Sequence, residues 1–299
     1  MSKRKKGAFK AGFVSIIGQP NVGKSTLMNA LVGERLSIIT AKAQTTRHRI
    51  MGILTGEDFQ IVYSDTPGVI KPKYELQKSM MRFVHSSLED ADLLLWVVDL
   101  EEKYDPTHPL IDKLLFTKIP MVVLLNKIDL ASGTQVKDKV HHWRQHLEGV
   151  SVLPISALKK VNLDQVFKSI LDHLPEHPPY FPADSLTDKP ERFFAAEVIR
   201  EKIFQNYKQE VPYSCEVVVT EFKEDEKIIR MRAEIYVERQ SQKGILIGKK
   251  GAALKKVGIA SRKDLEKFFD KQVHLETFVK VAADWRKKQM RLKQFGYSG

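Results

Sequence analysis

The 299-residue sequence predicts two domains: an α/β domain with a mostly parallel sheet and helices on both faces, and a small α+β domain after it. In the first part, apolar runs rich in β-branched residues alternate with helical stretches, as they do when strands are buried on both faces. Five of the chain's 13 prolines then fall between residues 175 and 190, where neither a helix nor a central strand can continue. After them, a helix and two strands precede two more helices and a last strand.

The first domain is expected to span residues 1–180. A strand at Gly12–Ile17 leads through a glycine loop into a helix at Ser25–Glu34. The remaining strands are predicted, the first two as a hairpin, at Ile50–Leu54, Phe59–Ser64, Leu93–Val98, Met121–Leu125 and Ser151–Ile155. Further helices are predicted at Leu76–Glu89, near His108–Phe116 and at Val136–Leu147.

A Pro-rich linker is expected at 181–190 and the second domain at 191–299. Its predicted elements are a helix at Glu191–Tyr207, strands at Cys215–Phe222 and Ile228–Val237, two helices broken at Gly248–Gly251, and a strand at Val273–Val281.

Charge and composition narrow the class of protein. Residues 191–299 carry 24 Lys and Arg against 16 Asp and Glu, whereas the first domain is near neutral outside the basic arm Lys3–Lys6, so a polyanionic partner should meet the second domain. The single cysteine, Cys215, excludes an internal disulfide framework and fits a reducing cytosol. The apolar runs are only strand-length and Ala8–Gly18 is too short and polar for an export signal, so we expect a cytoplasmic protein without a transmembrane segment.

A phosphate-binding loop is predicted between the first strand and the first helix. Residues 18–25 fit the pattern G-x-x-x-x-G-K-[ST], whose backbone N–H groups surround phosphates at a helix N-terminus. Lys24 should neutralise the β- and γ-phosphates, and the Ser25 hydroxyl should ligate Mg²⁺. The loop residues expected at the nucleotide are Gly18, Asn21, Val22, Gly23, Lys24, Ser25 and Thr26. The alternative is a chance glycine-rich turn.

Two later segments complete a guanine-nucleotide site. In Asp65-Thr66-Pro67-Gly68, Asp65 can hold Mg²⁺ through a water and the Gly68 N–H can reach the γ-phosphate, although alone this segment would be read as a turn. In Asn126-Lys127-Ile128-Asp129, the Asp129 carboxylate can accept from the guanine N1–H and N2–H₂, which adenine lacks. Asn126 and Lys127 would brace the loops and cover the base. A backbone N–H of Ser156-Ala157-Leu158 can reach the guanine O6, so the predicted nucleotides are GTP and GDP.

The order of these motifs resembles the translation-factor class of GTPases, and Gln44-Thr45-Thr46-Arg47-His48 together with Pro20-Asn21 resembles its Era branch. The resemblance implies that Thr46 reaches Mg²⁺ when GTP is bound, with Thr45 as the alternative. The metal ligands expected are therefore Ser25, Thr46 and Asp65. A solvated polar loop is the other reading of residues 41–49.

One position departs from signalling GTPases. The residue after Gly68 is Val69 rather than a water-orienting glutamine, so slow intrinsic hydrolysis is expected unless another group stabilises the transition state. In related GTPases with a hydrophobic residue here, an asparagine at the place of Asn21 helps bind K⁺, although Asn21 could equally be a plain loop residue. The residues assigned to catalysis are Lys24, Thr46, Gly68 and Asn21.

The second domain carries a G-x-x-G loop between its two later helices. Gly248, Lys249, Lys250 and Gly251 would let an RNA backbone approach closely, and Ile245 and Ile247 could pack beneath bases. Eight basic residues and no acidic one occur from Arg239 to Lys263. Alone, this pattern is equally a helix–helix turn with a solvated basic rim.

The order of elements decides between these readings. It resembles the type II KH (K-homology) domain, so that with the preceding motifs the chain resembles the Era-like family over essentially its whole length: a P-loop G domain followed by a type II KH domain. The tail Asp284–Lys288 is similar to that family's ending, and Arg286 and Lys287 are expected among the RNA contacts.

The resemblance implies binding near the 3′ end of 16S ribosomal RNA and assistance to maturation of the 30S subunit, with GTP hydrolysis switching that binding. It also implies weak peripheral attachment at the inner face of the cell membrane, and we expect a monomer. Two other classes compete: a P-loop enzyme that modifies an RNA-bound substrate, and a structural ribosome-binding protein with an inactive nucleotide site. The first lacks a spare acceptor-site base, and the second conflicts with the intact motifs.

Overall fold

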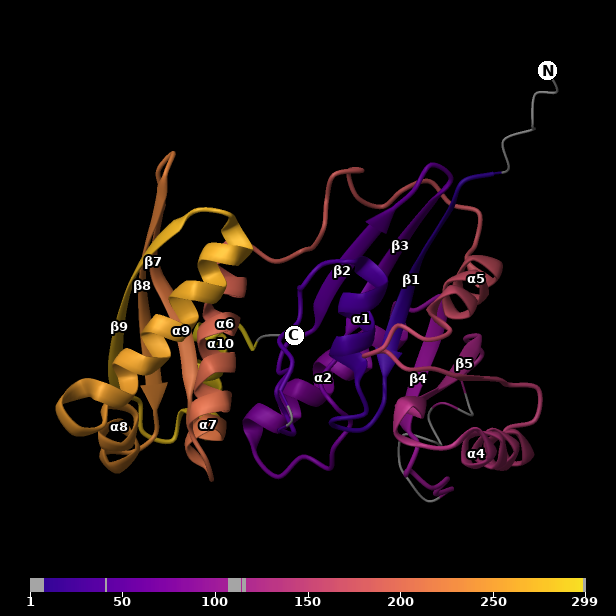
Figure 1. Cartoon of the computed structure of the whole chain (residues 1–299), viewed down its shortest axis with the longest axis horizontal. Coiled ribbons are helices and arrows are strands. Elements are labelled where there is room, and N and C mark those ends of the chain that lie inside the picture. Colours follow the sequence, from indigo (N-terminus) through magenta and orange to yellow (C-terminus); the bar gives the residue numbers. More distant parts are fainter. Residues whose placement is uncertain (1–7, 41, 107–113, 115–116, 298–299) are drawn as a thin grey trace. The chain divides into compact units, whose positions relative to one another are not determined.

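The computed structural model describes residues 8–40, 42–106, 114 and 117–297. It divides into two compact units, one drawn from residues 1–37, 46–71 and 81–188, the other from 38–45, 72–80 and 189–299 (Figure 1). The basic arm Lys3–Lys6 and, apart from Leu114, the helix predicted near His108–Phe116 lie outside the described residues.

The first unit is built on a six-stranded sheet in the order β2-β3-β1-β4-β5-β6. All neighbouring pairs are parallel except β2 with β3, which form the predicted hairpin. The strands are β1 Lys10–Ile17, β2 Ile50–Thr55, β3 Phe59–Asp65, β4 Leu93–Asp99, β5 Met121–Asn126 and β6 Ser151–Pro154. Because β3, β1, β4, β5 and β6 are parallel, the loops after them leave the same edge of the sheet.

Strand β4 is apolar up to its last residue because both faces of the sheet are covered there. The first six residues of β4 are all buried, although successive side chains face opposite sides of the sheet. On one side Trp96 meets Trp143 edge-to-face at 5.2 Å within an apolar cluster. The covering helices are α1 Lys24–Val32, α2 Glu75–Glu89, α4 Gly133–His146 and α5 Leu163–His173.

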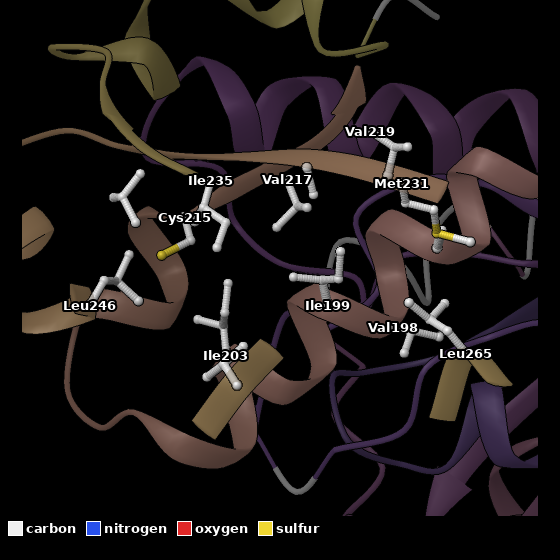
Figure 2. Close-up of a cluster of buried hydrophobic side chains, with 14 of the residues drawn as sticks. Val198, Ile199, Ile203, Cys215, Val217, Val219, Met231, Ile235, Leu246 and Leu265 are labelled. Atoms are coloured by element: carbon white, nitrogen blue, oxygen red, sulfur yellow. The ribbon is translucent and has the colours of Figure 1, made fainter. Parts of the chain in front are cut away.

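The second unit contains a three-stranded sheet, β7-β8-β9, with β7 antiparallel and β9 parallel to β8. Its elements are α6 Glu191–Asn206, α7 Val211–Ser214, β7 Glu216–Glu224, β8 Ile228–Val237, α8 Gln240–Ile247, α9 Ala252–Phe269, β9 Gln272–Val281 and α10 Gln289–Gln294. The core lies between the sheet and α6, α8 and α9, and Figure 2 shows Ile199 and Ile203 of α6 directed toward Val217 and Ile235 of the sheet. Cys215 is buried there as a free thiol.

The chain after β9 is part of this unit's interior. Trp285 is fully buried and its indole N–H donates to the Ser214 carbonyl at 2.9 Å. The Tyr297 hydroxyl donates to the buried Glu216 carboxylate at 2.6 Å. Buried polar groups are costly unless they are paired, so these bonds fix the tail on the domain.

The predicted fold classes, a mostly parallel α/β domain and a small α+β domain, are confirmed. Helix α5 was missed, although Leu163, Val166 and Ile170 follow helical spacing; α7 and α10 were also missed. Within the described ranges, no helix combines the length and the apolarity needed to cross a bilayer.

Candidate nucleotide site and nucleic-acid surface

The phosphate loop joins β1 to α1 as the sequence predicts. Gly23 precedes the first helical residue in a left-handed conformation, and the buried Lys24 begins α1. The Lys24 ammonium donates to the carbonyls of Gly18 at 3.1 Å and Gln19 at 2.8 Å. Burial lowers the pKa of Lys24 to about 8, against the attraction of Asp65 and Glu102, so the side chain remains a cation at neutral pH.

The three residues expected to bind Mg²⁺ lie together. The Ser25 hydroxyl donates to Asp65 Oδ2 at 2.6 Å and lies 2.9 Å from Thr46 Oγ1. Asp65 is fully buried, and its other oxygen, Oδ1, has no hydrogen-bond partner among the described residues. Burial raises the pKa of Asp65, opposed by the hydrogen bond from Ser25 and the charge of Lys24. The neighbouring Ser37 hydroxyl and Thr66 N–H also oppose this rise in pKa. A buried carboxylate beside two hydroxyls fits a hard divalent cation.

Among the described residues, no group of three or more His, Cys, Asp or Glu side chains could hold a metal ion. Mg²⁺ prefers oxygen ligands and usually keeps several waters, binding through few protein groups and substrate phosphates. The donor set of Ser25, Thr46 and Asp65 has that character.

The segment after β3 approaches the phosphate loop closely. A Cβ at Gly68 would lie 2.6 Å from the backbone nitrogen of Pro20, so only glycine fits there. The next residue, Val69, donates its N–H to the Gly18 carbonyl at 3.0 Å, while its side chain packs against the Trp96 cluster. Its side chain is therefore occupied in the core and has no polar group to orient water.

The loops after β5 and β6 are joined through Asn126. Its amide donates to the Val22 carbonyl at 2.7 Å and its Oδ1 accepts from the Ala157 N–H at 2.9 Å. Asp129 accepts from the Ser156 hydroxyl at 2.5 Å, which orients its carboxylate. Of the three backbone N–H groups of residues 156–158, one of which is expected at guanine O6, that of Ala157 is thus engaged by Asn126, while the Leu158 side chain is exposed.

Sequence reasoning missed the carboxylates that follow β4. Asp99 pairs with Lys127 at 2.5 Å, and Glu102 lies close enough to Lys24 to affect its pKa. No motif marks either residue. They could be found only from the parallel pairing of β4 with β1 and β5, which brings the loop after β4 to the same edge of the sheet.

The G-x-x-G loop has the exposed form expected of a nucleic-acid surface. Gly248 and Gly251 have positive φ angles of 70° and 78°, and a Cβ at Gly248 would lie 2.6 Å from that of Ala253. Lys249 and Lys250 are exposed between them. Ile245 is 52% exposed, whereas Ile247 is partly buried against the domain core. Arg239, just before α8, is also exposed, as are Lys255, Lys256, Arg262, Lys263 and Lys267 of α9.

Arg286 has a different environment from Lys287. Its guanidinium pairs with Glu238 and lies 5.3 Å from the centroid of the Tyr74 ring. Lys287 is exposed. The sequence grouped both as RNA contacts, but Arg286 is largely engaged within the domain.

Two segments that flank the nucleotide motifs belong to the second unit. From the first, the Lys42 ammonium donates to the carbonyls of Phe204 and Tyr207 at the C-terminus of α6. From the second, Gln77 donates to Gln44 of the first segment at 3.2 Å. The residues that continue into Thr46 are thus held by α6.

Two protein families match the chain: one described as a 50S ribosome-binding GTPase over residues 13–127, and the KH domain over residues 210–286. A crystal structure of Era in complex with MgGDPNP and nucleotides 1506–1542 of 16S ribosomal RNA is 39% identical, with a TM-score of 0.91. A variant of Era from Aquifex aeolicus bound to GDP and AlF4⁻ is also 39% identical, with a TM-score of 0.92. Each alignment covers 97% of this chain and 100% of the other.

Proposed function

Because this chain belongs to the Era family of GTPases, we propose that it binds the 3′ region of 16S ribosomal RNA through its KH domain and assists maturation of the small ribosomal subunit. GTP hydrolysis is the activity of the family. In this proposal it switches the binding of RNA. The G domain is assigned to 1–180, the linker to 181–190 and the KH domain to 191–299.

The nucleotide is assigned to the edge of the sheet where the loops after β1, β3, β5 and β6 meet. Lys24 would hold the β- and γ-phosphates, and Asp129, oriented by Ser156, would read the guanine edge. Mg²⁺ would be held by Ser25, Thr46 and Asp65 and would neutralise charge on the phosphates. The convergence of the Ser25 and Thr46 hydroxyls on the buried Asp65 carboxylate is the observation that supports this assignment most directly.

The RNA is assigned to the exposed basic face around the G-x-x-G loop. Seven basic residues of the stretch 239–263 are exposed and the stretch contains no acidic residue, although Arg262 pairs with Glu266 beyond it, so a phosphate backbone would meet a net positive field. Exposed Ile245 offers apolar surface for a base. A single strand whose bases are unstacked is the form of RNA that such a surface reads.

The switch is assigned to the segment 42–46. Thr45 bonds to Thr40 and to the Lys42 carbonyl, and the Lys42 side chain bonds to α6, while Thr46 lies at Ser25. A change of ligands at Thr46 on hydrolysis would therefore pull on a segment tied to the KH domain.

The test is RNA binding by the full chain in two nucleotide states. A labelled RNA of the 16S 3′ sequence should bind more tightly with a non-hydrolysable GTP analogue than with GDP, and a scrambled RNA of equal length should bind weakly in both. Lys42→Ala should reduce the difference between the two states without abolishing nucleotide binding. Equal affinity for both RNAs in both states would overturn the proposal.

A further inference from the structure

Glu102 is a carboxylate that none of the nucleotide motifs includes, although it lies beside them. It belongs to a tight turn after β4: its N–H donates to the Asp99 carbonyl at 2.9 Å, and its Oε2 accepts from the Asp99 N–H at 3.3 Å. The two reciprocal bonds hold the side chain at the end of β4, beside Gln19 of the phosphate loop. There, Gln19 hydrogen-bonds to the carboxylate and Lys24 attracts it.

The groups that face Glu102 come from three elements. Gln19 lies in the phosphate loop, Lys24 begins α1, and Asp99 ends β4. The Asp99 carboxylate is itself paired with Lys127, the residue after β5. Lys24 is the cation whose charge acts on Glu102, and it is also the residue that the nucleotide phosphates need.

The surroundings of Glu102 within the protein raise its pKa. Burial, and secondarily the negative charge of Asp99, raise the pKa of Glu102 to about 6, although the Asp99 N–H, Lys24 and Gln19 favour the ionised form. Half of the Glu102 side chains in a population of molecules are therefore protonated at a pH about one unit below neutrality. A further negative charge nearby would bring this titration into the physiological range.

We propose that Glu102 competes with the nucleotide phosphates for Lys24 and takes up a proton when guanine nucleotide binds. This inference rests on the assignment of the phosphates to Lys24. The phosphates bring several negative charges to an ammonium that carries one positive charge, so an ionised Glu102 is repelled. Protonation at its carboxylate relieves the repulsion and leaves an O–H that can donate to a neighbouring oxygen.

The sign of the effect follows from linkage. Nucleotide binding raises the affinity of Glu102 for a proton. Nucleotide affinity is therefore highest at pH values below the pKa of Glu102 in the nucleotide-free protein, and it falls as the pH rises above that pKa. The fall ends once the pH exceeds the titration point of the complex. Each pH unit between the two titration points lowers nucleotide affinity about tenfold. Glu102 thereby makes the site bind more tightly in a more acidic medium.

The experiment compares the full-length protein with Glu102→Gln, a neutral side chain of the same shape that keeps an oxygen for the Asp99 N–H. The matched control is Glu101→Gln, because Glu101 is an exposed neighbour of the same charge. GDP affinity and proton uptake are measured by calorimetry in buffers of different ionisation enthalpy, from about pH 5.5 to about pH 8. Because the terminal phosphate of GDP titrates in the same range, proteins are compared at each pH.

We expect Glu102→Gln to equal wild type near pH 5.5 and to bind GDP about tenfold more tightly near pH 8, with less proton uptake at neutral pH. Glu101→Gln should follow wild type throughout. Parallel affinity curves, or weaker binding by Glu102→Gln at every pH, would overturn the inference and assign Glu102 a purely structural role. A wild-type protein that failed to bind GDP at any pH would instead overturn the nucleotide site itself.

Discussion

The Thr46 hydroxyl lies 2.9 Å from that of Ser25, whereas the hydroxyl of the preceding Thr45 points elsewhere, bonding to Thr40 at 2.6 Å and to the Lys42 carbonyl at 2.7 Å. Two adjacent threonines with the same motif context therefore have different environments. One faces the cation site and the other fastens the switch segment.

This difference predicts different effects of two matched substitutions. Thr46→Ala should lower GTP hydrolysis about 100-fold or more and raise the Mg²⁺ concentration needed for activity, because a ligand that acts on developing phosphate charge is lost. Thr45→Ala should keep the wild-type Mg²⁺ requirement. Steady-state hydrolysis against Mg²⁺ concentration measures both, with thermal unfolding as a check that each variant folds. The reverse pattern would make Thr45 the ligand.

Base selection is predicted to depend on Asp129. In Asp129→Asn the amide oxygen can still accept from Ser156, but an N–H₂ replaces the oxygen that faces the guanine donors. GTP affinity should fall about 100-fold or more, and xanthosine triphosphate, which offers an acceptor there, should become the preferred nucleotide. Competition binding with the two nucleotides measures this. Unchanged preference for GTP in the variant would refute the role of Asp129.

The missing glutamine predicts a dependence on monovalent cations. The Val69 side chain packs against the Trp96 cluster and cannot orient water, so hydrolysis should be about tenfold faster in K⁺ than in Na⁺ at equal ionic strength. This factor is small beside the roughly 10³–10⁵-fold increase in kcat that an arginine finger supplies. Asn21→Gly should remove the difference. Glycine is the suitable replacement because Asn21 has a φ of 65°, which most side chains disfavour. Equal rates in both salts would reject the K⁺ site and leave the GTPase activity unaffected.

The G-x-x-G loop should govern affinity for RNA rather than the choice of sequence. Lys249→Ala with Lys250→Ala should lower the slope of log affinity against log salt by about 1.4, at about 0.7 per phosphate contact on a single strand. Replacing both by Asp should weaken binding further while GTP hydrolysis continues. The charge-matched control is Lys223→Asp with Lys227→Asp, on the exposed β7–β8 hairpin. RNA affinity that changed equally in both Asp variants would exclude a specific role for the loop.

The sequence was most informative where structure depends on local spacing. The strand Leu93–Val98 could be read directly because both its faces are buried, which leaves a continuous apolar run. The phosphate loop and the G-x-x-G loop are likewise determined by residues within one short segment. Helix α5 carried a comparable signal in Leu163, Val166 and Ile170, and its omission was an error of interpretation rather than a lack of information.

Other features could not be predicted because they depend on contacts between distant segments. The direction of Thr45 is set by Thr40, and the environment of Glu102 by strand order. Arg286 illustrates the same limit, because a basic run suggests solvent or RNA until the structure places Glu238 and Tyr74 beside this residue. Charge indicates a partner but does not identify it.

The bond between Tyr297 and Glu216 also has a consequence for biosynthesis. Glu216, the first residue of β7, is synthesised 81 positions before Tyr297, whose hydroxyl donates to its carboxylate. Until the segment through Tyr297 has left the ribosome, the Glu216 carboxylate lacks this partner, and until Trp285 has done so the Ser214 carbonyl lacks its indole N–H. The KH domain therefore cannot complete its packing strand by strand as it emerges. The preceding domain, by contrast, can close its core while the rest of the chain is still being translated.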